Sequence, residues 1–420
     1  MNIIDELEWR DAINQQSDAE GLRKLTGNKA VSLYCGVDPT GDSMHVGHLI
    51  PFIVLKRFQL AGHRPVILIG GATGTIGDPS GRASERTLQT MEQIEANVDA
   101  LTKQMKKLFV TDNDASQVRL VNNYDWTHQI NVIDFLRDYG KNFSINTMLA
   151  KDVVASRLES GISFTEFSYQ ILQSLDYLHL FRHEDVQLQI GGSDQWGNIT
   201  SGLDLIRKKE GPEAEAYALT IPLMLKADGT KFGKSAGGAV WLDPDKTTPY
   251  EFYQFWANTD DRDVVKYLKY FTFLGKEEIE ALAAKVEAEP HKREAQKALA
   301  EEMTRFVHGE DALEQAKRIT AALFSGDIRS LTADEIEQGF KEMPTFEASK
   351  ETKNIVDWLV DVGIAPSKRQ AREDVSAGAI YLNGERIADL AFDVTAEHAI
   401  GGRFIIIRKG KKKYSLVKLA

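Results

Sequence analysis

The fold of this chain is decided by residues 31–48, which read VSLYCGVDPTGDSMHVGH. The run 31–37 is short and largely apolar, which is typical of a buried strand. A proline and a glycine then favour a turn, and Asp42 or Ser43 is expected to cap a helix over 43–60. A buried strand that enters a helix through a tight turn predicts the first half of a βαβ unit.

The same alternation of short apolar runs and helical spacing continues to about residue 240. Further strands are expected at 65–69, 118–121, 186–190 and 218–225, and further helices at 88–108, 130–139 and 165–179. We therefore predict an α/β fold with a doubly wound, mostly parallel, Rossmann-like sheet. In such a sheet the ligand lies at the carboxyl ends of the strands.

The second half of the chain differs in composition from the first. After residue 248 it becomes helical, charged and poor in glycine, and its periodicity weakens before a final small module. That module is expected to contain two helices, at 354–362 and 367–377, then a strand at 379–382 and an Asn-Gly turn. The predicted organisation is a catalytic domain over 1–247, a helical domain over 248–325, a linker over 326–350 and a small basic α+β domain over 351–420.

The composition is that of an ordinary soluble globular protein, with 420 residues, 42% hydrophobic and 27% charged. Its single cysteine, Cys35, excludes an intramolecular disulfide and metal sites built from several thiolates, and it fits a reducing compartment. The N-terminus lacks the layout of a signal peptide, and no apolar run approaches the roughly 18 residues of a membrane helix. We therefore expect a cytoplasmic protein without a membrane segment.

The net charge of −11 is unevenly distributed. Residues 350–420 hold 13 basic and 9 acidic side chains, a net of +4, so the rest of the chain carries −15. Residues 403–420 hold seven basic residues and no acidic one. A basic module on an acidic body points to a polyanionic partner, although a solvated basic face would have the same composition.

His45 and His48 are expected to project from one side of the first turn of the helix over 43–60. Backbone N–H groups and the positive end of the helix dipole point to the same place, which favours an anion such as a phosphate. Gly47 leaves the backbone bare, so that a flat base can pack closely. A pair of metal-binding or internally bonded histidines is the alternative, but no third ligand stands at the usual spacing.

The segment 226–238 reads KADGTKFGKSAGG and contains four glycines, which exclude a stable helix or strand. Lys231 and Lys234 are three residues apart in it. A mobile arm that carries two ammonium groups suits phosphates whose charge is being redistributed. The alternative is an exposed flexible loop without a function.

Tyr169, Gln173 and Asp176 share one face of an otherwise apolar helix, at positions i, i+4 and i+7. Each buried polar group that lacks a partner costs about 1–3 kcal/mol. A ligand with polar ends would supply partners, and so would an internal hydrogen-bond network. Asp194 follows a Gly-Gly pair after a predicted strand, which is typical of nucleotide sites.

These motifs resemble a known family. HVGH at 45–48 resembles the HIGH signature of class I aminoacyl-tRNA synthetases, and KFGKS at 231–235 resembles their KMSKS loop. Three further runs are similar to the tyrosyl-tRNA synthetases of bacterial type, namely YCGVDPT at 34–40, YQILQSLD at 169–176 and GGSDQWGNI at 191–199. The C-terminal module is similar to an RNA-binding domain of a ribosomal small-subunit protein. The departures from the signatures, Val46 and Phe232-Gly233, remove no imidazole or ammonium group.

The resemblance implies a two-step reaction without a covalent enzyme intermediate. The carboxylate of L-tyrosine attacks the α-phosphate of ATP to give tyrosyl-adenylate and pyrophosphate, and tyrosyl is then transferred to the 3′-terminal adenosine of tRNA(Tyr). Mg²⁺ is expected to accompany ATP, held mainly by phosphates and water rather than by a protein cage. The resemblance also implies a homodimer.

The resemblance carries roles over to individual residues. The residues implied in catalysis are Thr40, His45, His48, Lys231 and Lys234. Those implied in tyrosine binding are Tyr34 and Asp176 at the phenolic hydroxyl, Asp78, Tyr169 and Gln173 at the ammonium group, and Gln195 beside the carboxylate. Those implied in ATP binding are Cys35, Gly36, Asp38, Gly47, Gly192, Asp194 and Lys234. For tRNA binding we expect the basic residues Arg207, Lys208, Arg408, Lys409, Lys411, Lys412 and Lys413, and we expect no metal ligand in the protein.

Three alternatives remain open. A small nucleotidyltransferase that shares the H-x-G-H element would not need the basic C-terminal module. A protein that serves only as an RNA scaffold would be expected to have lost an imidazole or an ammonium group, and both histidines and both lysines are present. Tryptophan activation is disfavoured because an indole would present its donor to Tyr34 and Asp176 at the wrong place.

Overall fold

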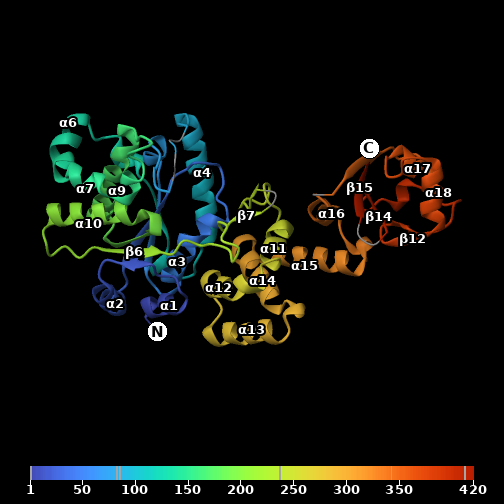
Figure 1. The fold of residues 1–420 in the computed structure, drawn as a ribbon, viewed down its shortest axis with the longest axis horizontal. Helices are drawn as coiled ribbons and strands as arrows, with labels where there is room; N and C mark the ends of the chain where they lie inside the picture. The colour runs from blue at the N-terminus through green and yellow to red at the C-terminus, as the bar shows by residue number, and fades with distance from the viewer. Residues whose placement is uncertain (1, 82–83, 85–86, 236–237, 342, 411–412) are drawn as a thin grey trace. The chain divides into compact units, whose positions relative to one another are not determined.

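The computed structural model describes residues 2–81, 84, 87–235, 238–341, 343–410 and 413–420. The chain forms two compact units (Figure 1). Unit 1 comprises Met1–Lys246 and Thr259–Leu299, and unit 2 comprises Thr247–Asn258 and Ala300–Ala420. None of the described helices is long and apolar enough to cross a membrane.

Unit 1 is built on a six-stranded sheet with the order β1-β6-β5-β2-β3-β4. Its strands are β1 (Gln15–Gln16), β2 (Ser32–Val37), β3 (Arg64–Ile69), β4 (Arg119–Asn122), β5 (Val186–Gly192) and β6 (Tyr217–Ile221). Only β1 runs antiparallel to its neighbour; the other pairs are parallel. The chain proceeds outward from β2 to β4 and then continues on the other side of β2 with β5. This confirms the doubly wound sheet and places its switch point between β2 and β5.

Four longer helices pack on this sheet, because each has an apolar face to bury. They are α3 (Leu49–Leu60), α4 (Met91–Leu108), α9 (Phe164–His183) and α10 (Trp196–Glu210). In Figure 1, α4 lies to one side of the strands, and α9 with α10 lies to the other. The remaining helices within unit 1 are α1 (Ile3–Trp9), α2 (Ala19–Asn28), α5 (Tyr124–Thr127), α6 (Val132–Asp134), α7 (Ile145–Leu149), α8 (Asp152–Ala155), α12 (Asp261–Phe271) and α13 (Lys276–Ala288).

The boundaries of several elements differ from the prediction. The helix expected over 43–60 is a 3₁₀ turn, Val46–His48, followed by α3. The helix expected over 130–139 is α6 followed by a π-helical turn, Phe135–Tyr139. The strand expected over 218–225 ends at Ile221, because the chain then leaves the sheet to begin the loop that carries the lysines. The helix expected over 165–179 extends to His183 as α9.

Unit 2 contains a five-stranded sheet with the order β12-β11-β14-β15-β9. The strands are β9 (Thr345–Ala348), β11 (Ile380–Leu382), β12 (Glu385–Ile387), β14 (Phe404–Lys409) and β15 (Lys413–Leu419), and a separate pair is formed by β10 (Lys353–Asn354) and β13 (Asp393–Val394). The helices are α11 (Pro249–Ala257), α15 (Glu310–Ser325), α16 (Ala333–Gly339), α17 (Ile355–Asp361) and α18 (Lys368–Ser376), while α14 (Glu294–His308) begins in unit 1 and ends in unit 2.

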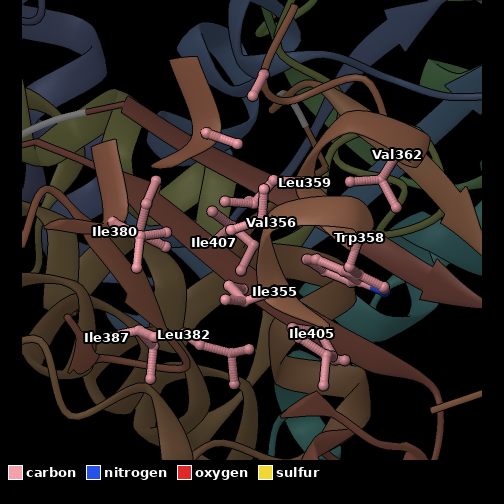
Figure 2. Close-up of a cluster of buried hydrophobic side chains, with 14 of the residues drawn as sticks. Ile355, Val356, Trp358, Leu359, Val362, Ile380, Leu382, Ile387, Ile405 and Ile407 are labelled. Atoms are coloured by element: carbon pink, nitrogen blue, oxygen red, sulfur yellow. The ribbon is translucent and has the colours of Figure 1, made fainter. Parts of the chain in front are cut away.

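The core of unit 2 lies on both faces of this sheet. Figure 2 shows one of the two clusters, in which Trp358 and Leu359 of α17 meet Ile405 and Ile407 of β14. Because side chains alternate along a strand, Ile406 points to the opposite face, where it packs with helices α15 and α16. Both faces of β14 are therefore buried, as its run of isoleucines requires.

The segment 326–350, predicted as a linker, is folded. It contains α16, which begins at a capping box formed by Thr332 and Glu335, and β9, which pairs in parallel with β15. The weak periodicity that suggested a linker reflects the shortness of these elements. The division of the chain into the four predicted domains stays a prediction.

Candidate active site

A cavity of about 350 Å³ lies at the carboxyl ends of β2 and β5, at the switch point of the sheet. It is lined by residues from the two strands, from the turn after β2, from the 3₁₀ turn and from α9. Fourteen predicted site residues line it: Tyr34, Cys35, Gly36, Asp38, Thr40, Gly47, His48, Asp78, Tyr169, Gln173, Asp176, Gly192, Asp194 and Gln195. Residues distant in sequence are thus brought into one site.

Tyr34 and Asp176 form a buried polar pair in the wall of the cavity, with exposed fractions of 1% and 2%. The two oxygens of Asp176 accept hydrogen bonds from Asn123 Nδ2 and Trp126 Nε1, both at 3.0 Å. The Tyr34 hydroxyl has no hydrogen-bond partner among the described residues. An unpaired buried hydroxyl costs about 1–3 kcal/mol. A ligand that bonds to it would recover this free energy.

Burial dominates the electrostatics of this pair. It raises the pKa of Asp176 to about 7, although the two N–H donors favour the charged form. It also raises the pKa of Tyr34 well above its ordinary value, and the nearby charge of Asp176 adds to this effect. The phenol of Tyr34 is therefore protonated, and Asp176 changes its charge close to neutral pH.

Asn123 and Trp126 were not identified from the sequence. Asn123 follows β4 and also bonds to Ala72 and Thr73, so it ties the loop after β3 to Asp176. A signal was present, because Asn123 stands just beyond the predicted strand 118–121, at the carboxyl end where functional side chains of parallel strands gather. Trp126 gives no comparable signal.

A second group of polar side chains lies along the wall formed by α9. Tyr169 Oη donates to Asp38 Oδ2 at 2.8 Å, and Gln195 Nε2 donates to Asp78 Oδ2 at 2.8 Å. Burial, followed by the charge of Asp78, raises the pKa of Asp194 above its ordinary value. With Asp176, four acidic side chains thus line this one cavity. Their combined field favours a cationic group of a ligand.

Asn198, a further residue not identified from the sequence, joins the two amides of this wall. Its Nδ2 donates to Gln173 Oε1 at 3.1 Å and to Gln195 Oε1 at 3.3 Å. These bonds fix the orientation of both glutamine side chains. Asn198 lies one turn into α10, in the GGSDQWGNI run, and that run was the only signal for it.

The glycines after β5 bring the backbone to the cavity surface. A Cβ on Gly192 would lie 2.6 Å from Asp194 Oδ1, and one on Gly191 would lie 3.0 Å from Gln195 Cβ. No larger residue fits here without movement of its neighbours. Cys35 at the end of β2 is buried, which raises the pKa of its thiol to about 12. This thiol is protonated at neutral pH and is not a nucleophile.

The histidine pair begins the 3₁₀ turn in a way that the sequence did not predict. His45, rather than Asp42 or Ser43, is the N-cap: its Nδ1 accepts from Gly47 N at 3.0 Å. His48 Nδ1 in turn accepts from His45 N at 3.1 Å. The ring centroids are 4.0 Å apart. Since each Nδ1 is an acceptor, each neutral ring carries its proton on Nε2 and donates there.

The predicted caps have other roles. Ser43 Oγ donates to the carbonyl of Met44 at 2.8 Å, and Asp42 pairs with Lys246 at 2.9 Å. Asp and Ser are ordinary caps, whereas a histidine cap is uncommon, so propensity pointed to the wrong residue.

The lysine loop lies against the histidine turn. A Cβ on Gly233 would lie 3.3 Å from Gly47 N, and its φ of +96° is one that only glycine adopts readily. The ring of Phe232 stacks on Phe271 of α12, with a centroid distance of 5.0 Å. Phe232 and Gly233, which depart from the KMSKS pattern, therefore hold the loop against α12 and against the histidine turn.

The two lysines of this loop are described to different extents. Lys231 is exposed, and its charge lowers the pKa of Asp194, against the larger effect of burial. Lys234 begins the short strand β7 (Lys234–Ser235), which pairs with β8 (Gly238–Ala239). The side chain of Lys234 lies outside the described part of the structure. His45 and Lys231 are not among the described residues that line the cavity.

The basic residues predicted to bind tRNA occupy two regions. Arg207 and Lys208 lie in the last turn of α10 in unit 1, and Lys208 donates to the carbonyl of Asn142. In unit 2, Arg408 and Lys409 end β14, and Lys413 begins β15. Lys411 and Lys412 lie outside the described residues. Arg207 and Lys208 do not line the cavity.

Comparisons with known proteins relate this chain to one enzyme family. Residues 26–325 match the family described as tRNA synthetases class I (W and Y), and residues 335–417 match the tyrosine–tRNA ligase SYY-like C-terminal domain. The chain is 78% identical to tyrosine–tRNA ligase 2 of Bacillus cereus (strain ZK / E33L) and 70% identical to tyrosine–tRNA ligase 1 of Enterococcus faecalis, over all of each chain.

A solved structure is also similar to this chain. The C-terminally truncated mitochondrial tyrosyl-tRNA synthetase of Aspergillus nidulans is 33% identical, with a TM-score of 0.69. The match covers 77% of this chain and 94% of that one.

Proposed function

The chain belongs to the tyrosine–tRNA ligase family of class I aminoacyl-tRNA synthetases, and from this premise we propose how its side chains carry the reaction. The activity is ligation of tyrosine to tRNA, in a family that uses ATP. The observation that carries the proposal is the unpaired hydroxyl of Tyr34 beside the buried carboxyl of Asp176. These two groups are suited to the phenolic hydroxyl of tyrosine, which both donates and accepts a hydrogen bond.

The ammonium group of tyrosine is proposed to bind beside Asp78, Tyr169 and Gln173. The acidic character of this wall supports the assignment, because Asp38 and Asp194 add to the negative field. Gln195 is held between Asp78 and Asn198, which leaves it beside the expected position of the carboxylate. The amino acid would thus lie with its ring toward Tyr34.

ATP is proposed to bind along Cys35, Gly36, Asp38, Gly47, Gly192, Asp194 and Lys234. The close contact of the backbone at Gly192 with Asp194 supports a ribose beside that carboxylate, and the place of Gly47 in the cavity lining supports a base packed on it. A carboxylate oxygen of tyrosine attacks the α-phosphorus, a P–O bond forms, and the bond to pyrophosphate breaks with its electron pair on the leaving group. Thr40, His45, His48, Lys231 and Lys234 are proposed to stabilise that developing charge.

Transfer to tRNA follows in the same site. A hydroxyl oxygen of the 3′-terminal adenosine attacks the carbonyl carbon of the adenylate, and AMP leaves with the electron pair of the broken C–O bond. We propose that phosphates of tRNA(Tyr) contact Arg207 and Lys208, and Arg408, Lys409, Lys411, Lys412 and Lys413. The net charge of +4 over residues 350–420 supports an RNA partner on an otherwise acidic chain.

Mg²⁺ is proposed to enter with ATP. Within the described ranges no group of three or more His, Cys, Asp or Glu side chains is arranged to hold a metal ion. No step is assigned to a protein-held ion. Phosphate oxygens and water are the ligands that Mg²⁺ ordinarily takes with nucleotides.

We propose that the protein is a homodimer in the cytoplasm. Exposed large apolar side chains are concentrated in one stretch of unit 1: Val132, Ile133, Leu136, Ile145, Leu158 and Phe164. Such a concentration is typical of a surface that a second subunit covers.

The cytoplasmic assignment is supported by the free thiol of Cys35 and by the reaction with tRNA.

The experiment that tests this function is ATP–pyrophosphate exchange with each of the standard amino acids in turn, without tRNA. Exchange is expected with tyrosine alone, because only its hydroxyl satisfies both Tyr34 and Asp176. Folded protein that exchanges with none of them would contradict the proposed site, and exchange with tryptophan as well would contradict the proposed roles of Tyr34 and Asp176.

Tyrosine binding is also expected to weaken as the pH falls below about 7. Burial raises the pKa of Asp176 to about 7, so its side chain is a carboxylate above this pH and a neutral acid below it. Only the carboxylate offers the charge-assisted acceptor for the phenolic O–H. The KM for tyrosine in exchange should rise by up to about tenfold per pH unit below the pKa, and Asp176→Asn should remove this dependence. A flat profile in the unsubstituted protein would contradict the assignment.

A further inference from the structure

His179 of α9 forms a flat stack with Trp126, the indole that donates to Asp176. The ring centroids of His179 and Trp126 are 4.1 Å apart, and their planes differ by 12°. Trp126 Nε1 donates to Asp176 Oδ1 at 3.0 Å. Asp176 and His179 are three residues apart on α9, so they are neighbours on one face of the helix. One helix thus supplies both the buried carboxylate and the ring that packs on its hydrogen-bond donor.

Trp126 is not fixed by its own helix or by the core. It lies in α5, a helix of four residues, and its side chain is half-buried. It packs against the core cluster that includes Tyr34, and with His179 it also lines a second cavity, of about 370 Å³. The charged residues of that cavity are Arg119, Asp125 and Glu184. Because the indole borders open space, packing by the core alone does not determine its rotamer.

His179 is neutral at pH 7 and above. Burial, followed by the charge of His183, lowers the pKa of its imidazole below the ordinary value, while the charge of Glu184 opposes them and that of Arg182 adds to them. A neutral imidazole packs on an indole as other flat aromatic rings do. The stack therefore depends on the ring of His179 rather than on a charge.

We propose that His179 is a positioning residue for the recognition of tyrosine. Its ring holds the indole of Trp126 in the orientation in which Nε1–H points at Asp176, the proposed acceptor for the phenolic O–H. Groups that bind a substrate selectively are held in place by neighbours whose own rotamers are fixed by packing. His179 is not among the described residues that line the substrate cavity, so we expect it to act through Trp126. This inference rests on the role proposed for Asp176.

His179→Ala is expected to raise the KM for tyrosine about tenfold in ATP–pyrophosphate exchange, because a hydrogen bond to a charged group contributes a factor of this order. The preference for tyrosine over phenylalanine should fall by the same factor. The kcat and the KM for ATP should change little, since the contact with the phenolic group is the same in the ground state and the transition state. His179→Phe keeps a flat ring and should restore the KM and the preference.

A double variant tests whether His179 acts through the indole. Trp126→Phe keeps a ring for the stack but has no N–H, and it should lower the preference for tyrosine at least as much as His179→Ala does. In the Trp126→Phe background, His179→Ala should have no further effect on this preference, because the hydrogen bond that it orients is already absent. His128→Ala is the matched control: His128 stacks on Tyr124 with a centroid distance of 4.9 Å and an interplanar angle of 9°. It should leave the preference unaltered.

The pH profile of the KM for tyrosine would not be moved by a merely structural role. Burial raises the pKa of Asp176, and the hydrogen bonds from Asn123 and Trp126 lower it, while the charge of Asp38 adds to burial. Loss of the bond from Trp126 therefore raises this pKa further. As the pH falls, the KM should begin to rise at a higher pH in His179→Ala than in the unsubstituted protein, and His179→Phe should restore the original profile.

Each remaining result counts against one proposal. An unchanged KM for tyrosine in His179→Ala, additive effects in the double variant, or a His179→Phe variant that restores nothing would overturn the positioning role. A fall in Tm together with losses in kcat and in the KM for ATP would show that His179 supports the fold, and would overturn it as well. No tyrosine-dependent exchange in the unsubstituted protein would count against the proposed function. If Asp176→Asn alters selectivity and His179→Ala does not, only this inference fails.

Discussion

Asp176→Asn is expected to lower the preference for tyrosine over phenylalanine by about 10²-fold or more. When phenylalanine occupies the cavity, the Tyr34 hydroxyl lacks a partner among the described residues, and the buried carboxylate of Asp176 keeps only its bonds from Asn123 and Trp126. A site of this kind rejects the analogue without a hydroxyl by about 10⁴–10⁵-fold, and enzymes of this same family are the standing example. A buried group that loses a hydrogen-bond partner costs about 1–3 kcal/mol, and more when it is charged, so replacing the carboxylate with a neutral amide removes a corresponding part of the discrimination.

The measurement is the ratio of kcat/KM for the two amino acids in ATP–pyrophosphate exchange. Asp185→Asn is the matched control: Asp185 is exposed just beyond α9 and has a φ of 57°, which asparagine tolerates. Its selectivity should equal that of the unsubstituted protein. An unchanged ratio for Asp176→Asn, with an unchanged Tm, would show that the phenolic hydroxyl is recognised elsewhere.

The sheet was predictable because its four central strands, β2, β3, β5 and β6, are largely buried and so appear as apolar runs. The run 31–37 and the strand β2 differ by one residue. The pattern after β6 was harder to interpret, because residues 222–225 remain apolar although they leave the sheet. Composition alone did not mark the end of the strand, because Leu223 is apolar although 63% of its surface is exposed.

The site was predictable where its residues lie on one helix face or at the end of one strand. Tyr169, Gln173 and Asp176 were recognised from their spacing in an apolar helix, and they line one cavity. Trp126 was missed because its role depends on contact with Asp176, fifty positions away, which no local pattern encodes. Asn123 was missed although its place just beyond a predicted strand was a signal.

In unit 2, too, a pairing between segments far apart in the sequence could not be predicted from either segment alone. β9 is four residues long, and its pattern is unremarkable until it is paired with β15, some seventy residues later. A short edge strand gains its stability from its partner rather than from its own sequence. The segment around it therefore resembled a linker, although it completes the sheet.

His45→Asn is expected to slow the formation of tyrosyl-adenylate by about 10²–10³-fold without a change in Tm. The imidazole has two separable functions. Its Nδ1 caps the 3₁₀ turn by accepting from Gly47 N at 3.0 Å, and its Nε2–H is the donor proposed for the pyrophosphate. Asparagine is a good N-cap and keeps the first function, but it has no atom at the position of Nε2. A donor that acts on developing charge contributes a factor of this size.

Three variants separate these functions in single-turnover measurements of adenylate formation. His45→Ala loses the cap as well and should also be less stable, by about 1 kcal/mol. His128→Asn, the same change at an exposed histidine of unit 1, should leave both rate and Tm unaltered. Because the donor is proposed to act mainly as the bond to pyrophosphate breaks, the KM for ATP should change little in His45→Asn while the rate falls. If rate and Tm fell together in His45→Asn, His45 would be a structural cap and the charge on pyrophosphate would have to be stabilised by His48 and the lysine loop instead.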